Sequence, residues 1–189
     1  MNPKGNNTDY NQLNEDELID GCIKQDVHFQ RLLYEKYAGK MMAVCLRYCN
    51  SRMEAEDVLQ DAFIKIFDKI QGFQKRGSLE GWIKRIMINS ALKSNDKRVR
   101  KFEPGSLDHI NEPSYDSTAL GKIETKALLA IIQKLPQGYR TVFNMYAIEG
   151  YSHKEIGDIL GVSEVTSRTQ YSRAKKTLIK LLEEHGIER

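Results

Sequence analysis

Residues 150–182 read GYSHKEIGDILGVSEVTSRTQYSRAKKTLIKLL, and this stretch predicts the most specific structure in the chain. Ser152 and Glu155 form the capping-box pattern that begins a helix, and Gly161 is the residue type that commonly ends one. Ser163 can cap a second helix directly afterwards. The pattern therefore predicts two helices joined by a tight turn, which is a helix-turn-helix.

The second of these helices has one mostly apolar face and one polar, basic face. The apolar stripe, which we expect to pack on the first helix, contains Ser167, Tyr171, Ala174, Leu178 and Leu181. Outward-facing side chains suited to base edges or phosphates are Thr166, Arg168, Thr169, Gln170, Arg173 and Lys176. Residues 163–180 hold five basic side chains and one acidic side chain. The face therefore indicates DNA binding, with an ordinary helical hairpin that has a solvated basic face as the alternative.

The composition describes a globular chain with room for two small domains. It has 189 residues and a formal net charge of +3, enough for two units of under about a hundred residues each. The chain has no long apolar run and starts with polar residues, so we expect neither a membrane span nor a secretory signal. The expected location is therefore the cytoplasm. Its three cysteines lack metal-finger spacing, so we expect buried thiols, no metal and no cofactor.

Helical periodicity runs through most of the chain, so the predicted fold class is all-α. The expected N-terminal helices cover residues 14–24, a segment starting at Asp26, its partner 38–49 after a break near Gly39, a helix opened by Ser51 and closed by Gly72, and 79–95. The expected C-terminal helices cover 118–135, 137–149 and the helix-turn-helix. Between them, Pro104, Gly105 and Pro113 indicate a linker. The predicted domains are 14–96 and 118–185, joined by a flexible linker, 97–117.

Two oppositely charged patches lie within the first predicted domain. Residues 54–68 hold five acids and one lysine, whereas residues 74–101 hold nine basic residues and two acids. Cations interspersed with Trp82 and Asn89 suit nucleic acid, including unpaired strands, although the helical spacing of Trp82 favours a core position. Acids in a first helical turn can simply stabilise the helix dipole, but Asp61 lies beyond that turn. The acidic helix is thus left for a protein partner.

Several phrases occur together in a characteristic order and spacing. They are DVHFQRLLYEKY (26–37), EAEDVLQDAFIKIFDKI (54–70), GSLEGWIKRIMINSAL (77–92), KLPQGYRTVFNMYAIEGYSHKEIGDILGVSE (134–164) and SRAKKTL (172–178). In this combination the chain resembles, from about residue 17 to residue 182, a bacterial RNA polymerase sigma factor of the extracytoplasmic function (ECF) group of the sigma-70 family. The resemblance implies two small helical domains, sigma region 2 and sigma region 4.

The resemblance also implies partners and residue roles. Core RNA polymerase would bind through its beta-prime clamp helices to Asp57, Gln60, Asp61 and Phe63, and through its beta flap to region 4. The minus-ten promoter element, with one base flipped into a pocket near the loop 73–78, would be bound by Lys75, Arg76, Lys84, Arg85, Asn89 and Lys93. The minus-thirty-five element would be read by Thr166, Arg168, Thr169, Gln170, Arg173 and Lys176. An anti-sigma factor is a further expected partner.

The expected function is transcription initiation: binding core polymerase, directing it to promoters and promoting DNA melting through binding energy rather than covalent chemistry. No nucleophile with a base, metal-ligand set or Gly-rich phosphate loop is apparent, so neither an enzyme nor a small-molecule substrate is expected. The alternative is a two-domain transcriptional regulator of the response-regulator type. Such a regulator needs an α/β sensor domain, for which the first half of the chain lacks strand patterns.

Overall fold

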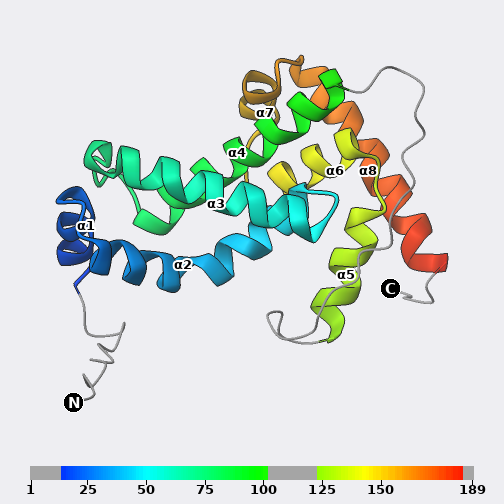
Figure 1. Cartoon of the computed structure of the whole chain (residues 1–189). Helices are drawn as coiled ribbons and strands as arrows, with labels where there is room; N and C mark the ends of the chain where they lie inside the picture. Colours follow the sequence, from blue (N-terminus) through cyan, green and yellow to red (C-terminus); the bar gives the residue numbers. More distant parts are fainter. Residues whose placement is uncertain (1–13, 102–122, 185–189) are drawn as a thin grey trace. The chain divides into compact units, whose positions relative to one another are not determined.

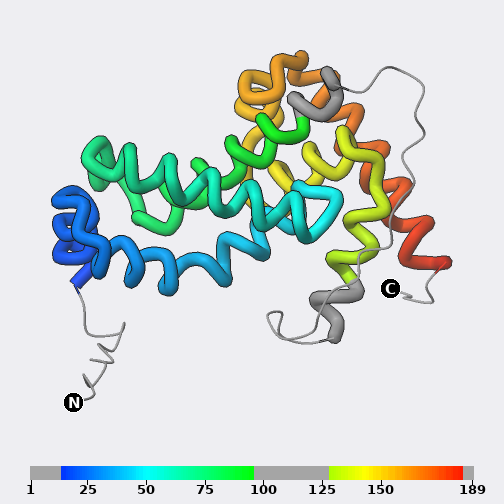
Figure 2. The backbone as a smooth tube through the Cα atoms, in the orientation of Figure 1, coloured from blue at the N-terminus to red at the C-terminus, as the bar shows by residue number. Residues whose placement is uncertain are grey.

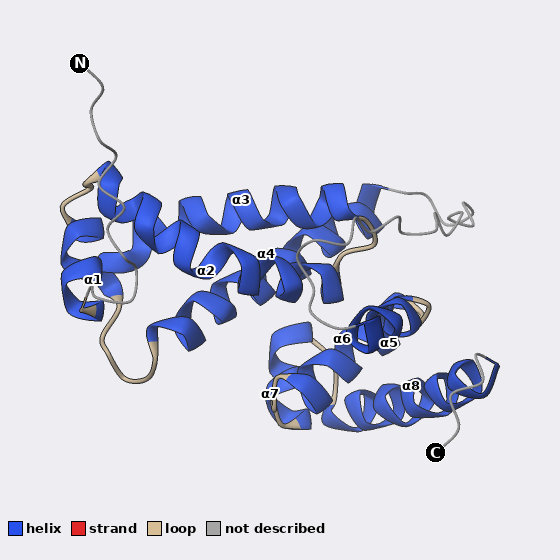
Figure 3. Ribbon diagram, turned by 90° about the horizontal axis from the view of Figure 1, so that it is seen from below, coloured by secondary structure: helices blue, strands red, loops and turns tan. Residues whose placement is uncertain are grey.

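The computed structural model describes the backbone of residues 14–101 and 123–184, and the side chains of 14–95 and 128–184. The described residues are helices and their connections, without a strand, which confirms the all-α prediction (Figure 3). By backbone contacts the chain divides into two compact units. The first is Met1–Cys45 with Glu56–Glu103, and the second is Leu46–Ala55 with Pro104–Arg189.

The first unit is a helical bundle. It contains α1 (Glu15–Ile23), most of α2 (Val27–Tyr48) and α3 (Arg52–Lys69), the 3-10 helix η1 (Ile70–Gly72) and α4 (Leu79–Lys101). Figures 1 and 3 show α2, α3 and α4 side by side, with α1 at the end where α3 leads into α4. Fully buried side chains of the bundle include Leu33, Met41, Ile66, Ile70, Leu79, Ile83 and Met87.

Local capping explains where two of these helices begin. The side chain of Asn14 accepts a hydrogen bond from Asp16 N at the start of α1. Ser51 Oγ accepts from Glu54 N at 3.1 Å, so Ser51 opens α3 as predicted. The returning bond of the expected capping box differs, because Glu54 Oε2 accepts from Asn50 N rather than from Ser51 N. Both starts follow from short polar side chains that satisfy otherwise unpaired amides.

Two helix boundaries in this unit differ from the sequence prediction. The expected break near Gly39 is wrong, because α2 continues from Val27 to Tyr48. Glycine in a helix costs about 1 kcal/mol relative to alanine, and burial of Leu33, Met41 and Val44 around it offsets this. The predicted end at residue 95 is also wrong, since α4 extends to Lys101 and thus into the predicted linker.

All three cysteines are buried free thiols, as predicted. Cys22 lies in α1, and Cys45 and Cys49 lie at or just beyond the end of α2. Burial raises the pKa of the Cys22 thiol to about 11, with a smaller contribution from Asp26. Since the thiolate is the reactive form, Cys22 remains an inert core side chain at neutral pH.

The second unit contains α5 (Ile123–Gln133), α6 (Gln137–Phe143), the π-helix η2 (Asn144–Ile148), α7 (His153–Leu160) and α8 (Glu164–Glu184). Figure 2 follows this chain from yellow-green α5 to the red end of α8. The most extensive contacts here join α6 and α7 to α8. The single helix predicted for residues 137–149 is an α-helix up to Phe143 and a π-helix from Asn144 to Ile148. Residues 118–122, where the preceding helix was expected to begin, lie outside the described part.

A buried polar cluster holds the second unit together. Arg140 is only 3% exposed and donates hydrogen bonds to Gln133 O, Tyr48 O and Asn50 Oδ1. Nearby, Arg47 Nη2 pairs with Glu149 Oε1 at 2.5 Å, and the Glu149 side chain is 1% exposed. Asn144 Nδ2 donates to Arg47 O at 2.7 Å. Residues 46–55 are therefore attached to the C-terminal helices by specific polar contacts.

Among the described residues, none of the helices combines the length and apolar character needed to cross a membrane.

Candidate nucleic-acid interface

The helix-turn-helix forms at the predicted residues. Ser152 and Glu155 make a complete capping box at the start of α7. Gly161 ends that helix with φ 68°, the left-handed conformation that glycine adopts readily. Ser163 Oγ then accepts a hydrogen bond from Thr166 N at 3.0 Å and caps α8. The turn geometry therefore follows directly from local sequence chemistry.

The two helices meet through small and aromatic side chains. Gly157 lies against the turn: a Cβ built there would be 2.7 Å from Val162 O. His153 on α7 stacks on Tyr146 with ring centroids 4.1 Å apart, and its Nδ1 lies 3.0 Å from Ser167 Oγ on α8. Burial lowers the pKa of His153, and the positive charge of Arg168 adds to this effect. A neutral imidazole therefore links α7 to α8. Sequence analysis missed the roles of His153 and Gly157.

The residues of α8 that were predicted to contact DNA include some with partners on the same helix or its cap and some without a partner in the described part of the chain. Arg168 pairs with Glu164 at 2.5 Å, and Thr169 Oγ1 donates to Val165 O at 2.9 Å. Thr166 is part of the cap, with its hydroxyl 2.8 Å from Ser163 Oγ. By contrast, Arg173 and Lys176 are exposed and have no hydrogen-bond or ion-pair partner among the described residues. Their charges are therefore the most available to an anionic ligand.

Gln170 is less exposed than the other α8 residues that were predicted to contact DNA. It is half-buried, and its side-chain amide lies beside Gly138 of α6, with Nε2 3.8 Å from where a Cβ on that glycine would be. Gln170 is thus positioned by α6 as well as by its own helix. The apolar stripe predicted for α8 is confirmed at its centre, where Ser167 and Ala174 are fully buried.

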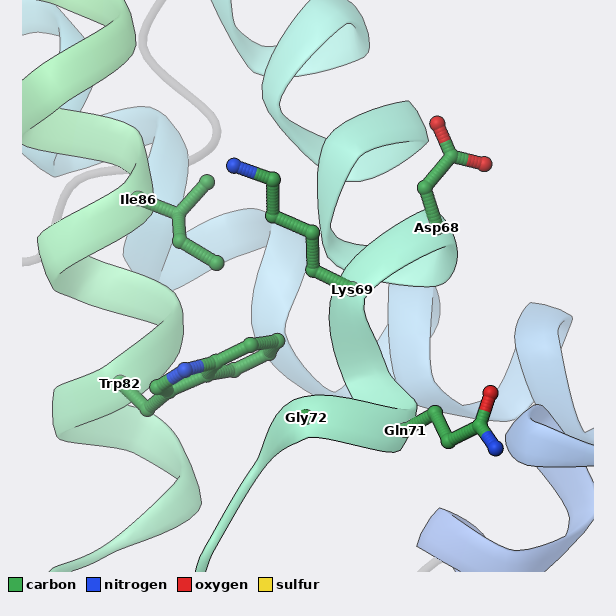
Figure 4. Close-up of a pocket in the computed structure, with 6 residues that line it drawn as sticks. All are labelled: Asp68, Lys69, Gln71, Gly72, Trp82 and Ile86. Carbon is green, nitrogen blue, oxygen red and sulfur yellow. The ribbon is translucent and has the colours of Figure 1, made fainter.

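In the first unit, a pocket of about 660 Å³ opens between the end of α3, η1 and the start of α4. Figure 4 shows the ring of Trp82 and the aliphatic chain of Lys69 extending into the space between the helices, while the Asp68 and Gln71 side chains point away. Trp82 also contacts Phe73, with ring centroids 5.5 Å apart. The expected core position of Trp82 is therefore wrong: its half-buried ring is held against Phe73 and lines an open pocket.

Polar side chains continue from this pocket along α4. Trp82, Ile86, Asn89 and Lys93 recur at helical spacing and share one stripe. Asn89, Lys93 and the neighbouring Arg85 are exposed, whereas Lys84 is half-buried. An aromatic wall followed by amide and cationic groups can stack a base and hold its backbone phosphates. Of the cations predicted here, Lys97, Arg98, Arg100 and Lys101 lie outside the described side chains.

The loop between η1 and α4 contains Lys75 and Arg76 and lies at the same end of the first unit as the pocket. Both side chains are exposed. Lys75 has φ 53° and its Nζ lies 2.5 Å from Asp16 Oδ1 on α1. That hydrogen bond is the first cause of the raised pKa of Lys75, and the charges of Asp16, Asp20 and Glu15 act in the same direction. Arg76 has no such partner among the described residues.

The acidic face of α3 is available for a partner. Asp57, Gln60 and Asp61 are exposed on one side of the helix, and Ile64 on the same side is 60% exposed. Sequence analysis missed Ile64, although its spacing from Gln60 and Asp61 was visible. Phe63 requires a correction as a direct contact: it is 2% exposed and packs against Tyr34, with ring centroids 4.7 Å apart.

Two family models match the chain in the order of the two groups of helices. The model described as Sigma-70 region 2 matches residues 33–101, and the model described as Sigma-70, region 4 matches residues 125–178. Together the two matches cover more than half of the chain. The chain is a sigma factor of the sigma-70 family.

Curated relatives place the sigma factor in the ECF group. It is 30% identical over 165 residues to the ECF RNA polymerase sigma factor SigE of Mycolicibacterium smegmatis, a match covering 82% of this chain and 62% of the relative. It is 27% identical over 184 residues to the RNA polymerase sigma-H factor of Pseudomonas aeruginosa, a match covering 91% of this chain and 95% of the relative.

A solved structure supports the fold of the sigma factor. The sigma factor RpoE of Bartonella quintana, solved in complex with the anti-sigma factor NepR, aligns with a TM-score of 0.59 at 20% identity. The alignment covers 81% of this chain and 96% of that chain. At this identity the likeness concerns the fold alone.

Proposed function

We propose that this sigma factor binds core RNA polymerase, directs it to specific promoters and promotes melting of the DNA there. The observation that carries the proposal is the presence of two chemically different cationic faces in one chain, one on α8 and one on α4. The α8 face, with Arg173 and Lys176, suits the major groove of a duplex. The α4 face, with Trp82 beside a pocket, suits unpaired bases.

The mechanism follows from the difference between these two faces. A pocket that accepts an unstacked base can be occupied only after the duplex has opened locally. Binding at Trp82, Asn89 and Lys93 therefore stabilises the open state without stabilising the closed state. A ligand shifts an equilibrium by its differential affinity for the two states. The chain thus acts by binding, and no covalent step by its own side chains is required.

Protein partners would use the acidic helix and region 4. Asp57, Gln60 and Asp61 present negative charge that phosphate would repel, and exposed Ile64 adds apolar area. We assign this face of α3 to the clamp helices of polymerase, with Phe63 supporting it from the core. Region 4 would rest on the beta flap. An anti-sigma factor is a further proposed partner, and the site of action would be the cytoplasm.

Transcription with purified components tests the proposal. With core polymerase and a library of genomic fragments, the chain should start transcripts from a small subset of templates, and gel filtration should show it co-eluting with the polymerase. Core polymerase alone is the control. A chain that neither co-elutes nor starts transcripts would be incompatible with this function. The response-regulator alternative needs an α/β sensor, and the described residues of the first unit contain no strand.

Arg173→Ala should weaken binding of polymerase holoenzyme to its promoter about tenfold, because an exposed arginine on a recognition helix can bind a guanine with two hydrogen bonds. The measurement is a titration of labelled promoter against holoenzyme. Templates with a scrambled minus-thirty-five element are the control: a base reader loses its effect on them. An equal loss on both templates would show a phosphate contact instead.

Trp82→Ala should reduce the fraction of open complex about tenfold, since stacking of a base on an aromatic ring contributes about 1 to 3 kcal/mol. Permanganate reactivity of unpaired thymines measures the opening. Trp82→Phe keeps a ring and should retain much of the activity. On a template already single-stranded across the minus-ten element, binding should also fall; unchanged binding there would remove Trp82 from the proposed base pocket.

A further inference from the structure

Helix α1 contacts the part of the first unit that borders the base pocket. Residues 33–101 match the Sigma-70 region 2 model, so α1 (Glu15–Ile23) precedes the matched region. Leu18, Ile19 and Cys22 on one face of α1 are buried, and α1 packs on η1. Gln71 and Gly72 of η1 line the pocket beside Trp82. Movement of α1 would therefore move a wall of the pocket.

The first turn of α1 also holds the loop that follows η1. Asp16 Oδ1 accepts a hydrogen bond from Lys75 Nζ at 2.5 Å, across 59 positions of sequence. Asp16 is itself fixed, because its backbone N donates to the Asn14 cap. Glu15 and Asp20 lie close enough to Lys75 to add their negative charge. The contact is exposed, so its role depends on geometry rather than on burial.

The backbone of Lys75 shows why the loop needs a restraint. Its φ of 53° lies in the left-handed region, which residues other than glycine, asparagine and aspartate rarely adopt. Unlike asparagine or aspartate, lysine has no short polar side chain that could hydrogen-bond to the nearby backbone in that conformation. The contact with Asp16 supplies one from outside the loop. Lys75 thus joins the loop 73–78, which includes Phe73 against Trp82, to α1.

We propose that Asp16 is a positioning residue for promoter opening: through Lys75 it holds the loop 73–78 and the η1 wall in the shape that accepts an unpaired base. Lys75 is then a structural member of the site rather than a phosphate contact. Arg76, the neighbouring exposed cation, remains for the phosphate. This inference rests on the proposed function, and it adds α1 and Asp16, which precede the residues matched to region 2, and gives Lys75 a structural role.

The test uses the full chain with core polymerase and a labelled promoter fork that is single-stranded across the minus-ten element. Asp16→Ala and Lys75→Ala should each weaken binding about threefold to fivefold, the range of an exposed ion pair. The double variant should bind the fork about as tightly as the weaker-binding of the two single variants, because both changes break the same contact. The exchanged pair, Asp16→Lys with Lys75→Asp, should recover most of the binding.

Salt dependence separates positioning from direct phosphate contact. Lys75→Ala should leave the slope of log binding constant against log salt unchanged, whereas Arg76→Ala, the matched control, should reduce it by about one contact. A reduced slope for Lys75→Ala would overturn the inference. So would tighter binding by Asp16→Ala, because Asp16 would then compete with DNA for the lysine.

Hydrogen exchange of the chain alone provides a readout that needs no DNA. Asp16→Ala should speed exchange of the amides in 73–78 while the unfolding midpoint stays unchanged. Unaltered exchange in this loop would overturn the inference and leave the proposed function intact. Wild-type protein that cannot retain the fork with polymerase would instead overturn the proposed function, and the inference with it.

Discussion

Arg140→Ala should lower the free energy of unfolding of the second unit by about 4 kcal/mol, the largest effect we expect from a single substitution. Arg140 is 3% exposed and donates to two backbone carbonyls, Gln133 O and Tyr48 O, as well as to the side chain of Asn50. Alanine would remove the donors and leave these acceptors buried. A cavity of the size of the lost side chain would add to the loss.

Urea unfolding followed by far-ultraviolet circular dichroism measures this effect. Trp82, the sole tryptophan, lies in the first unit, so its fluorescence follows that unit separately. Arg173→Ala is the matched control, since Arg173 is exposed and has no partner among the described residues. The two variants should behave oppositely: Arg140→Ala loses stability, and Arg173→Ala loses DNA binding. An Arg140→Ala protein of wild-type stability would contradict the structural role of the cluster.

Gly157→Ala should lower the stability of the same unit by about 3 kcal/mol, because the helix-turn-helix leaves no room for a Cβ at this position. The new atom would lie 2.7 Å from Val162 O and 3.5 Å from Glu164 N, both backbone atoms. The turn cannot easily move away, since Val162 N donates to Gly157 O at 3.0 Å. Displacing the turn would also tilt α8 and weaken promoter binding.

Gly138→Ala is the matched control for this substitution. Gly138 lies in α6 of the same unit, and its nearest neighbour to a new Cβ is Gln170 Nε2 at 3.8 Å, an ordinary contact. Because alanine is the better helix former, Gly138→Ala should be neutral or slightly stabilising. Equal stability of the two alanine variants in thermal unfolding would contradict the steric conflict expected between a Cβ at position 157 and Val162 O.

Predictions based on neighbouring residues were the most successful. Asn14, Ser51 and Ser152 each cap the helix that was expected after them, and Gly161 takes the left-handed conformation that ends α7. These features depend on side chains that bond to amides within three residues, so the local sequence contains the whole interaction. The helix-turn-helix could be predicted because both of its boundaries are of this kind.

Predictions that depended on packing were less successful. The break expected at Gly39 is absent because the buried face of α2 continues past it. Trp82 shares the spacing of core residues, yet Phe73 holds its ring at the edge of a pocket. Phe63, expected to contact polymerase, lies in the core against Tyr34. Periodicity identifies the side of a helix, but it does not indicate what lies opposite that side.

The amino-acid order by itself determined the helical fold class, the helix-turn-helix and the sigma-factor family, because capping, periodicity and motif spacing are properties of short stretches of chain. Tertiary structure alone decided which charged groups are available. Lys75 is engaged by Asp16 from 59 positions away, Arg140 contacts Asn50 from 90 positions away, and Arg173 has no partner among the described residues. Such pairings depend on where the folded backbone brings together residues that are far apart in the sequence, so local sequence patterns cannot predict them.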